Sequence, residues 1–137
     1  MEVKFYDKID DTLLKFAVII SKSNNKWVFC KHKERSTYEV PGGHREENET
    51  IYETAVRELK EETGAIDFNL KQIGVYSVIK NNIETFGMLY YAEIYSFNKT
   101  LHNEMECVLL LESFPNNWTY PEIQPKLIEE YEKRKHN

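Results

Sequence analysis

The sequence predicts an α/β fold in which a mixed sheet lies between two helices. Alternating apolar and polar residues over 70–80 and 85–97 are typical of paired strands, joined at Asn81-Asn82. A charged segment from Glu49 or Thr50 to Thr63 has helical periodicity, and a second helix is predicted to run from Pro121 to about Lys135. The length of 137 residues suits one domain spanning 1–137.

The remaining predicted strands are short, and they come before and after the first helix in the sequence. Leu14–Ser21 and Lys26–His32 read as two strands around a Ser23-Asn24-Asn25 turn. Tyr38–Val40 is predicted as a short strand that ends before Pro41, and Glu106–Leu111 as a further apolar strand.

The ends of the first helix carry recognisable signals. Thr50 and Glu53 form a capping-box pattern at the start, and Gly64 is a helix stop. Ile51, Ala55 and Leu59 recur every four residues and give the helix one apolar stripe. In the second helix the apolar face is predicted to consist of Ile123, Leu127, Ile128 and Tyr131.

Composition excludes some classes of function. A net charge of −5 argues against binding to duplex nucleic acid, which needs a basic surface. The N-terminus lacks a signal-peptide pattern and no segment is apolar enough to span a membrane, so the expected location is the cytoplasm. Cys30 and Cys107 form no metal or redox motif and are expected to be buried free thiols.

Three carboxylates of the charged helix fall on one face. Because an α-helix turns by about 100° per residue, Glu61 and Glu62 lie about 60° and 40° to either side of Glu58. Like charges at this spacing destabilise a helix. A cation would compensate them, and hard carboxylate oxygens suit Mg²⁺ or Mn²⁺. The alternative is a charged helix face that merely contacts water, but the exact spacing and the preceding Gly42-Gly43 loop favour a metal site.

The spacing resembles the signature of the Nudix family, G-x5-E-x7-R-E-U-x-E-E-x-G-U. Its fixed positions match Gly43, Glu49, the Arg57-Glu58-Leu59 run, the Glu61-Glu62 pair and Gly64, while Ala65 replaces the usual Ile, Leu or Val. This resemblance implies the Nudix α/β/α sandwich and hydrolysis of a nucleoside diphosphate linked to another group. It also implies metal ligation by Glu58, Glu61, Glu62 and the backbone carbonyl of Gly43.

The resemblance also suggests roles around this cluster. Arg57 and Glu49 are expected to orient the ligands rather than bind the metal, and Arg57 is also counted among the catalytic residues. A further acidic residue often precedes the last strand in such proteins, and Glu104 is preferred here over Glu106 as an added ligand or base. The identity of the general base stays open.

Contacts with substrate are predicted near the glycine loop. Arg35 is a candidate for the phosphates, as are Gly42, Gly43 and His44. The loop of residues 114–120 would help build the base pocket, where Asn116, Asn117 or Trp118 could read a purine or simply form a loop around a buried Trp. No role is assigned to His32, His102 or His136, which lack ligand spacing.

The substrate implied by the resemblance is a nucleotide. Residues 26–66, including His32-Lys33-Glu34-Arg35 and Tyr38-Glu39-Val40-Pro41-Gly42-Gly43, resemble MutT-like enzymes and lean towards 8-oxo-dGTP diphosphatases. The expected reaction converts a nucleoside triphosphate to the monophosphate and pyrophosphate, in a monomer or homodimer. RNA 5′ pyrophosphohydrolysis, ADP-ribose or dinucleoside polyphosphate hydrolysis, and a nucleotide-sensing domain without catalysis are the alternatives.

Overall fold

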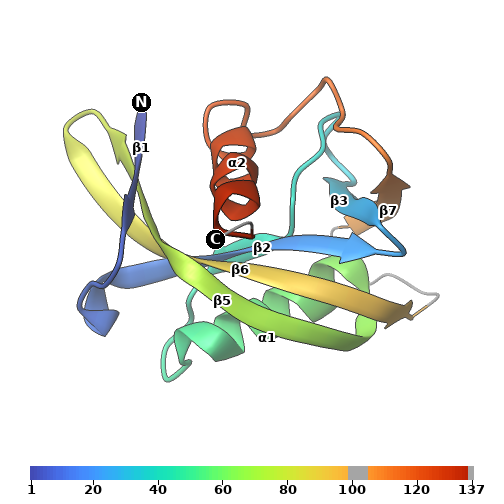
Figure 1. Cartoon of the computed structure of the whole chain (residues 1–137), viewed down its shortest axis with the longest axis horizontal. Helices are drawn as coiled ribbons and strands as arrows, with labels where there is room; N and C mark the ends of the chain where they lie inside the picture. The colour runs from blue at the N-terminus through green and yellow to red at the C-terminus, as the bar shows by residue number, and fades with distance from the viewer. Residues whose placement is uncertain (99–104, 136–137) are drawn as a thin grey trace.

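The computed structural model describes residues 1–98 and 105–135. Within these residues a seven-stranded sheet lies between helix α1 (Ile51–Thr63) and helix α2 (Gln124–Lys135), as Figure 1 shows. The predicted α/β/α arrangement is confirmed. No helix in the described part of the chain is both long and apolar enough to cross a membrane.

The sheet is mixed in direction. Its strand order is β1-β5-β6-β2-β3-β7, and β4 pairs with β2 outside this path. The β2–β6 pair is parallel and the other pairs are antiparallel. The strands are β1 (Glu2–Tyr6), β2 (Leu14–Ser23), β3 (Lys26–His32), β4 (Gly42–His44), β5 (Ala65–Lys80), β6 (Ile83–Phe97) and β7 (Met105–Leu111), with a short 3-10 helix at Asp11–Leu13 before β2.

Strand β2 shares one of its edges between two partners. Near its start it pairs with β4, with Ala17 opposite Gly43, and at its end it pairs with β3 through Lys22 and Ser23. Strands β3 and β4 therefore follow one another along the same edge of β2. A Cβ at Gly42 would lie 2.6 Å from the carbonyl oxygen of Ala17, so this approach requires glycine.

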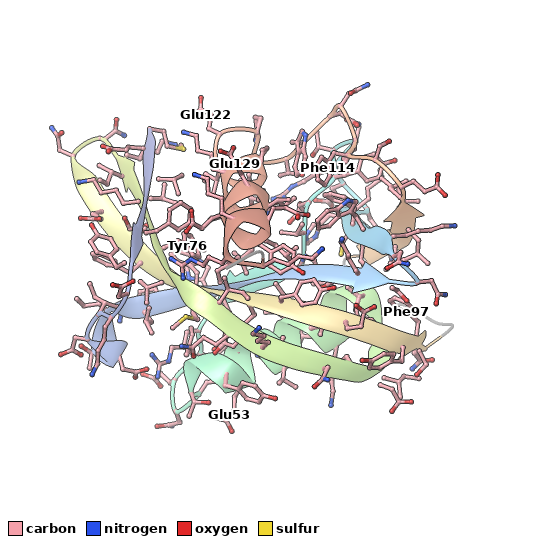
Figure 2. The ribbon with its side chains drawn as sticks, viewed as in Figure 1. Glu53, Tyr76, Phe97, Phe114, Glu122 and Glu129 are labelled. Atoms are coloured by element: carbon pink, nitrogen blue, oxygen red, sulfur yellow. The ribbon has the colours of Figure 1, made fainter. Side chains whose placement is uncertain are left out.

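Each helix covers its own apolar cluster. Ile51, Ala55 and Leu59 of α1 are buried against residues of β2, β5 and β6, as the predicted stripe requires. On the opposite face, α2 buries its own stripe against Tyr76 and Leu89, again as expected. Figure 2 shows Tyr76 on the side of the sheet that carries α2, and Glu53 on α1 at the other side.

The ends of the first helix follow the predicted signals. The side chain of Thr50 accepts from the backbone N–H of Glu53, the side chain of Glu53 accepts from the backbone N–H of Thr50, and Gly64 ends the helix at φ 75°. These interactions satisfy backbone groups that have no partner within the helix. The two long strands around Asn81-Asn82 are also confirmed, and β5 begins at Ala65, five residues before the predicted start.

Three boundaries differ from prediction. Strand β1 was not predicted; it pairs with β5 at the edge of the sheet. The predicted strand at Tyr38–Val40 consists of isolated bridges, and the regular pairing begins at Gly42. Helix α2 begins at Gln124 because Pro125 occupies its first turn, the position where a missing N–H does no harm. Pro121 lies in the preceding turn.

Candidate active site

The three glutamates of the predicted metal face lie together on α1, but they differ in exposure. The side chains of Glu58 and Glu62 are 13% and 11% exposed, whereas that of Glu61 is 45% exposed. Glu58 and Glu62 face the β4 segment, and all three residues line one cavity of about 400 Å³. The helical spacing has therefore placed two carboxylates inside the protein and one at the mouth of a cleft.

The Gly42-Gly43 segment lies directly against these carboxylates. The backbone N–H of Gly42 donates to Oε1 of Glu62 at 2.7 Å. A Cβ at Gly43 would lie 1.5 Å from Oε2 of Glu58, so only glycine leaves room for this side chain. The two glycines bring backbone polar groups to the place where the carboxylates gather.

Burial makes this cluster electrostatically costly. Burial raises the pKa of Glu58 to about 7, and the nearby Glu61 carboxylate adds to the rise. Burial also raises the pKa of Glu62 to about 8, with Glu58, Glu39 and Glu61 as further causes. A cluster of hard oxygen donors that lacks enough positive charge fits a divalent cation, because the cation removes the repulsion between the carboxylates.

Arg57 and Glu49 support the cluster from one side. Nε and Nη2 of Arg57 donate to the Glu49 carboxylate at 2.7 and 3.1 Å, and Nη2 also donates to the carbonyl of His44 at 2.9 Å. The Arg57 hydrogen bonds lower the pKa of Glu49 to about 2. Nη1 of Arg57 lies 3.4 Å from Glu61 and 3.6 Å from Glu58. Arg57 thus joins the start of the helix to its glutamates and to β4.

A second group of side chains meets Glu62 from the sheet. Nε2 of His32 lies 3.5 Å from Oε2 of Glu39 and 3.5 Å from Oε2 of Glu62. Glu39 faces Cys30 across an isolated antiparallel bridge, and His32 lies two residues further along β3 on the same face. Sequence reasoning gave no role to His32 or Glu39, because no regular spacing connects residues 32, 39 and 62.

The predicted substrate residues are only partly brought together. Arg35 lines the cleft and donates to Oε1 of Glu39 at 2.9 Å; a hydrogen bond with Tyr120 raises the pKa of its guanidinium. His44 lines the same cleft, is exposed, and packs its ring 4.3 Å from that of Phe16. Glu104 lies outside the described residues, as does the placement of the Glu106 side chain.

Asn117 and Trp118 in the loop before α2 contact other residues of the protein. Nδ2 of Asn117 donates to the carbonyl of Ser36, and the Asn117 carbonyl accepts from Tyr38 N–H. Trp118 packs edge-on against Phe29 with the ring centroids 5.3 Å apart. These contacts hold the loop to the sheet and agree with the reading of a loop around a packed Trp.

An apolar cavity of about 290 Å³ adjoins the carboxylate cleft on the α2 side of the sheet. The two cavities share five lining residues, namely Glu39, Gly42, Gly43, His44 and Tyr120. The rest of the apolar cavity is formed by side chains of the sheet and of the turn into α2, which are Phe16, Val18, Val40, Tyr76, Val78, Thr85, Ile123 and Gln124. An acidic cleft and an apolar pocket therefore meet at the glycine loop.

Comparison with known proteins gives consistent results. The NUDIX domain family matches residues 12–112. YtkD of Bacillus subtilis, named provisionally as an 8-oxo-dGTP diphosphatase, is 32% identical over 118 residues, which cover 85% of this chain and 74% of YtkD. An ADP-ribose pyrophosphatase of Methanocaldococcus jannaschii is 41% identical over 61 residues, 42% of this chain and 36% of that protein.

A solved structure agrees over nearly the whole chain. The crystal structure of a point mutant of the Bacillus subtilis pyrophosphohydrolase BsRppH superposes with a TM-score of 0.79 at 26% identity, covering 96% of this chain and 89% of that one. The family match, the sheet order and the glutamate cluster all describe one kind of enzyme. The chain belongs to the Nudix family and is a pyrophosphohydrolase of nucleotide-type substrates that uses divalent metal ions.

Proposed function

We propose that this enzyme hydrolyses purine nucleoside triphosphates to the monophosphate and pyrophosphate with Mg²⁺ or Mn²⁺, and that 8-oxo-dGTP is its preferred substrate. The observation that carries the proposal is that the two cavities share lining residues. A nucleotide has an anionic end and a flat apolar end, and the acidic cleft and the apolar pocket meet at Gly42, Gly43 and His44. The name of YtkD supports the choice of 8-oxo-dGTP.

The phosphates belong in the carboxylate cleft. Glu58, Glu61, Glu62 and the carbonyl of Gly43 would hold the metal, since they supply the hard oxygen atoms that Mg²⁺ and Mn²⁺ prefer. When bound, the metal lowers the pKa of water and neutralises phosphate charge. Arg35 lines the same cleft and would add a guanidinium contact to the phosphate chain.

The protein residues mainly position the substrate and the water, and they take little covalent part in the reaction. Arg57 keeps Glu58 and Glu61 in place through its contacts with Glu49 and His44. Water attacks an internal phosphorus, its oxygen forms the new P–O bond, and the bridging P–O bond breaks. With attack at the α-phosphorus, the electron pair of the broken bond leaves on the bridging oxygen of pyrophosphate, and the attacking water gives up a proton as the monophosphate forms.

The base belongs in the apolar pocket. Oε1 of Gln124 accepts from the backbone N–H of Val40 at 2.9 Å, so the group that Gln124 can offer to a ligand is its NH₂ donor. Guanine and 8-oxoguanine both present O6 as an acceptor, whereas adenine presents a donor at N6. A donor in this pocket therefore favours a keto purine over adenine. Phe16 and His44 supply aromatic surface beside it.

The products test the proposal directly. A digest of 8-oxo-dGTP or dGTP is separated by chromatography, and pyrophosphate is measured separately from orthophosphate. We expect the monophosphate and one pyrophosphate for each nucleotide consumed. Stoichiometric orthophosphate with a nucleoside diphosphate would refute this reading, and equal kcat/KM for 8-oxo-dGTP and dGTP would remove the preference for the oxidised base. ADP-ribose in the same panel tests the alternative class of substrate.

Gln124 gives a separate test of base recognition. In Gln124→Glu, one carboxylate oxygen can still accept from Val40, but the other presents an acceptor in place of the donor. We expect the ratio of kcat/KM for dGTP over dATP to fall by about tenfold or more, since leaving a buried hydrogen-bonding group without a matching partner costs about 1–3 kcal/mol. An unchanged ratio would show that Gln124 does not face the base, while leaving the reaction itself intact.

A further inference from the structure

We propose that His32, Glu39 and Glu62 form a second metal site, selective for a transition-metal ion such as Zn²⁺, beside the cluster of Glu58 and Glu61 that takes Mg²⁺ or Mn²⁺. Nε2 of His32 and one carboxylate oxygen from each glutamate all lie within 4.8 Å of one another. The proposal concerns metal binding and does not depend on which nucleotide is the substrate.

The distances from His32 to the two carboxylates fit co-ligands of one metal ion. An N–H···O hydrogen bond is about 2.7–3.2 Å long, shorter than either 3.5 Å distance from Nε2 of His32. A tetrahedral Zn²⁺ at about 2.0–2.2 Å from nitrogen and oxygen ligands holds those ligand atoms about 3.3–3.6 Å apart. The two distances of 3.5 Å from His32 match two edges of such a tetrahedron, and the two carboxylate oxygens lie within 4.8 Å of each other.

The carboxylates are already oriented for this role. Oε1 of Glu39 accepts from Nη1 of Arg35 at 2.9 Å, and Oε1 of Glu62 accepts from the N–H of Gly42 at 2.7 Å. In each glutamate one oxygen is anchored and the other, Oε2, faces His32. Hydrogen bonds of this kind to the outer atoms of ligands fix their direction and raise metal affinity.

The surroundings suit a partly buried metal with an open position. The side chains of Glu39, Glu62 and His32 are 7%, 11% and 19% exposed. All three residues line the carboxylate cleft, so a fourth ligand position can be filled by water from that cleft. The two carboxylates bring a negative charge that a divalent ion would offset.

The donor set determines which metal binds. An imidazole nitrogen suits Zn²⁺, Co²⁺ and Ni²⁺, whereas Mg²⁺ requires near-octahedral oxygen coordination and keeps several waters. Excess Mg²⁺ should therefore fill the cluster of Glu58 and Glu61 and leave the His32 site available. Glu62 would belong to both sites, since its Oε2 faces His32 and its Oε1, which accepts from the N–H of Gly42, is left for the ion at Glu58 and Glu61.

The test is a titration of the metal-free full-length protein with Co²⁺ in the presence of excess Mg²⁺. Four-coordinate Co²⁺ absorbs visible light far more strongly than six-coordinate Co²⁺, so its d–d bands report this geometry. We expect intense bands that saturate at one equivalent and disappear when one equivalent of Zn²⁺ is added. A weak six-coordinate spectrum in the wild-type protein would overturn the proposal.

Variants localise the site. His32→Gln should weaken Co²⁺ and Zn²⁺ binding by about 100-fold or more, since it removes a direct ligand, and removal of outer partners alone costs about 10–100-fold. His44→Gln is the matched control, because His44 is an exposed histidine that lines the same cleft outside the cluster. Equal loss in both variants, or no loss in His32→Gln, contradicts the assignment.

A measurement on the wild-type protein tests the proposal even if the variant fails to fold. The nitrogen chemical shifts of the histidine side chains are recorded by NMR with Mg²⁺ alone and after one equivalent of Zn²⁺. We expect Nε2 of one histidine to move to the range of a metal-bound nitrogen, and His32→Gln, shown to be folded by circular dichroism, to lack that signal. An unchanged Nε2 shift in every histidine refutes direct ligation.

Discussion

Replacing Glu62 by glutamine should stabilise the metal-free protein and at the same time remove its activity. The substitution keeps the volume of the side chain, and Oε1 of glutamine can still accept from the N–H of Gly42. It removes a negative charge from a buried position that Glu58, Glu39 and Glu61 surround. Stability and catalysis therefore change in opposite directions, which a simple packing role for Glu62 does not predict.

The size of the effect follows from the pKa of Glu62. Burial raises this pKa from an ordinary value of 4.5 to about 8. Because a tenfold change in proton affinity corresponds to about 1.4 kcal/mol, ionised Glu62 lowers the free energy of unfolding by at most about 4 kcal/mol at pH 8. The repulsion is shared with neighbouring carboxylates, so we expect Glu62→Gln to regain about 2 kcal/mol in the metal-free protein.

The dependence on pH has a defined sign. A carboxyl whose pKa is raised in the folded state binds protons more tightly than it does in the unfolded chain. The destabilisation is therefore absent below about pH 4.5, grows as the pH rises from about 4.5 to about 8, and is complete above about pH 8. The difference in free energy of unfolding between Glu62→Gln and wild type should be near zero at pH 4.5 and largest above pH 8, after subtraction of changes common to both proteins.

The assay combines denaturant unfolding with and without Mg²⁺ and the measurement of kcat. Metal should stabilise the wild type more than Glu62→Gln, because it binds the folded state through this carboxylate. We expect kcat to fall by about 10²-fold or more, the scale of losing one strong electrostatic contribution.

Glu61→Gln is the matched control on the same helix. Its side chain is 45% exposed, so its metal-free stability should change by no more than about 0.5 kcal/mol while its kcat also falls. A Glu62→Gln protein that is less stable than wild type without metal at pH 8, or that turns over normally, would refute the assignment of Glu62 as a buried metal ligand.

Three further substitutions test the support around the site. Gly43→Ala would place its Cβ 1.5 Å from Oε2 of Glu58, so kcat should fall by about 10²-fold or more in a protein that still gives a cooperative thermal transition. Glu49→Gln should lower the free energy of unfolding by about 1–3 kcal/mol at pH 7, because it weakens the pair with Arg57. Because the pKa of Glu49 is lowered to about 2, this loss should shrink as the pH falls from about 4.5 towards 2, as measured by urea titrations. Thr50→Ala should lower the unfolding free energy by about 1 kcal/mol without changing kcat, as measured by thermal melts beside activity assays.

Local signals in the sequence account for the helix that carries the site. The capping box, the apolar stripe and the glycine stop act within a few residues, so they can be read without knowing the rest of the fold. The same is true of the two long strands joined at Asn81-Asn82, where a short turn makes the pairing nearly local. Each of these features holds in the structure.

Features that depend on distant pairing could not be read in the same way. Strand β4 consists of Gly42, Gly43 and His44, which show no alternation, and it exists because β2 offers a free edge there. The preceding Tyr38–Val40 segment alternates like a strand but forms only isolated bridges. Tertiary context decides such short segments more strongly than propensity does. The order of the strands likewise could not be read from the residues.

The helical spacing predicted which carboxylates share a face but not what each of their oxygens contacts. In Glu62 the chain itself divides the two oxygens, because the N–H of Gly42 holds Oε1 and His32 lies beside Oε2. That division requires β3 to hold His32 beside Glu39 and the glycine segment to pair with β2. Sheet register sets both contacts. The helix thus sets the position of a glutamate of the Nudix signature, and the sheet sets the contacts that its carboxylate makes. The chemistry that distinguishes this enzyme from others with the same signature is therefore to be sought in the side chains that meet Glu62 from the sheet, which are His32 of β3 and Glu39 of the segment that follows it.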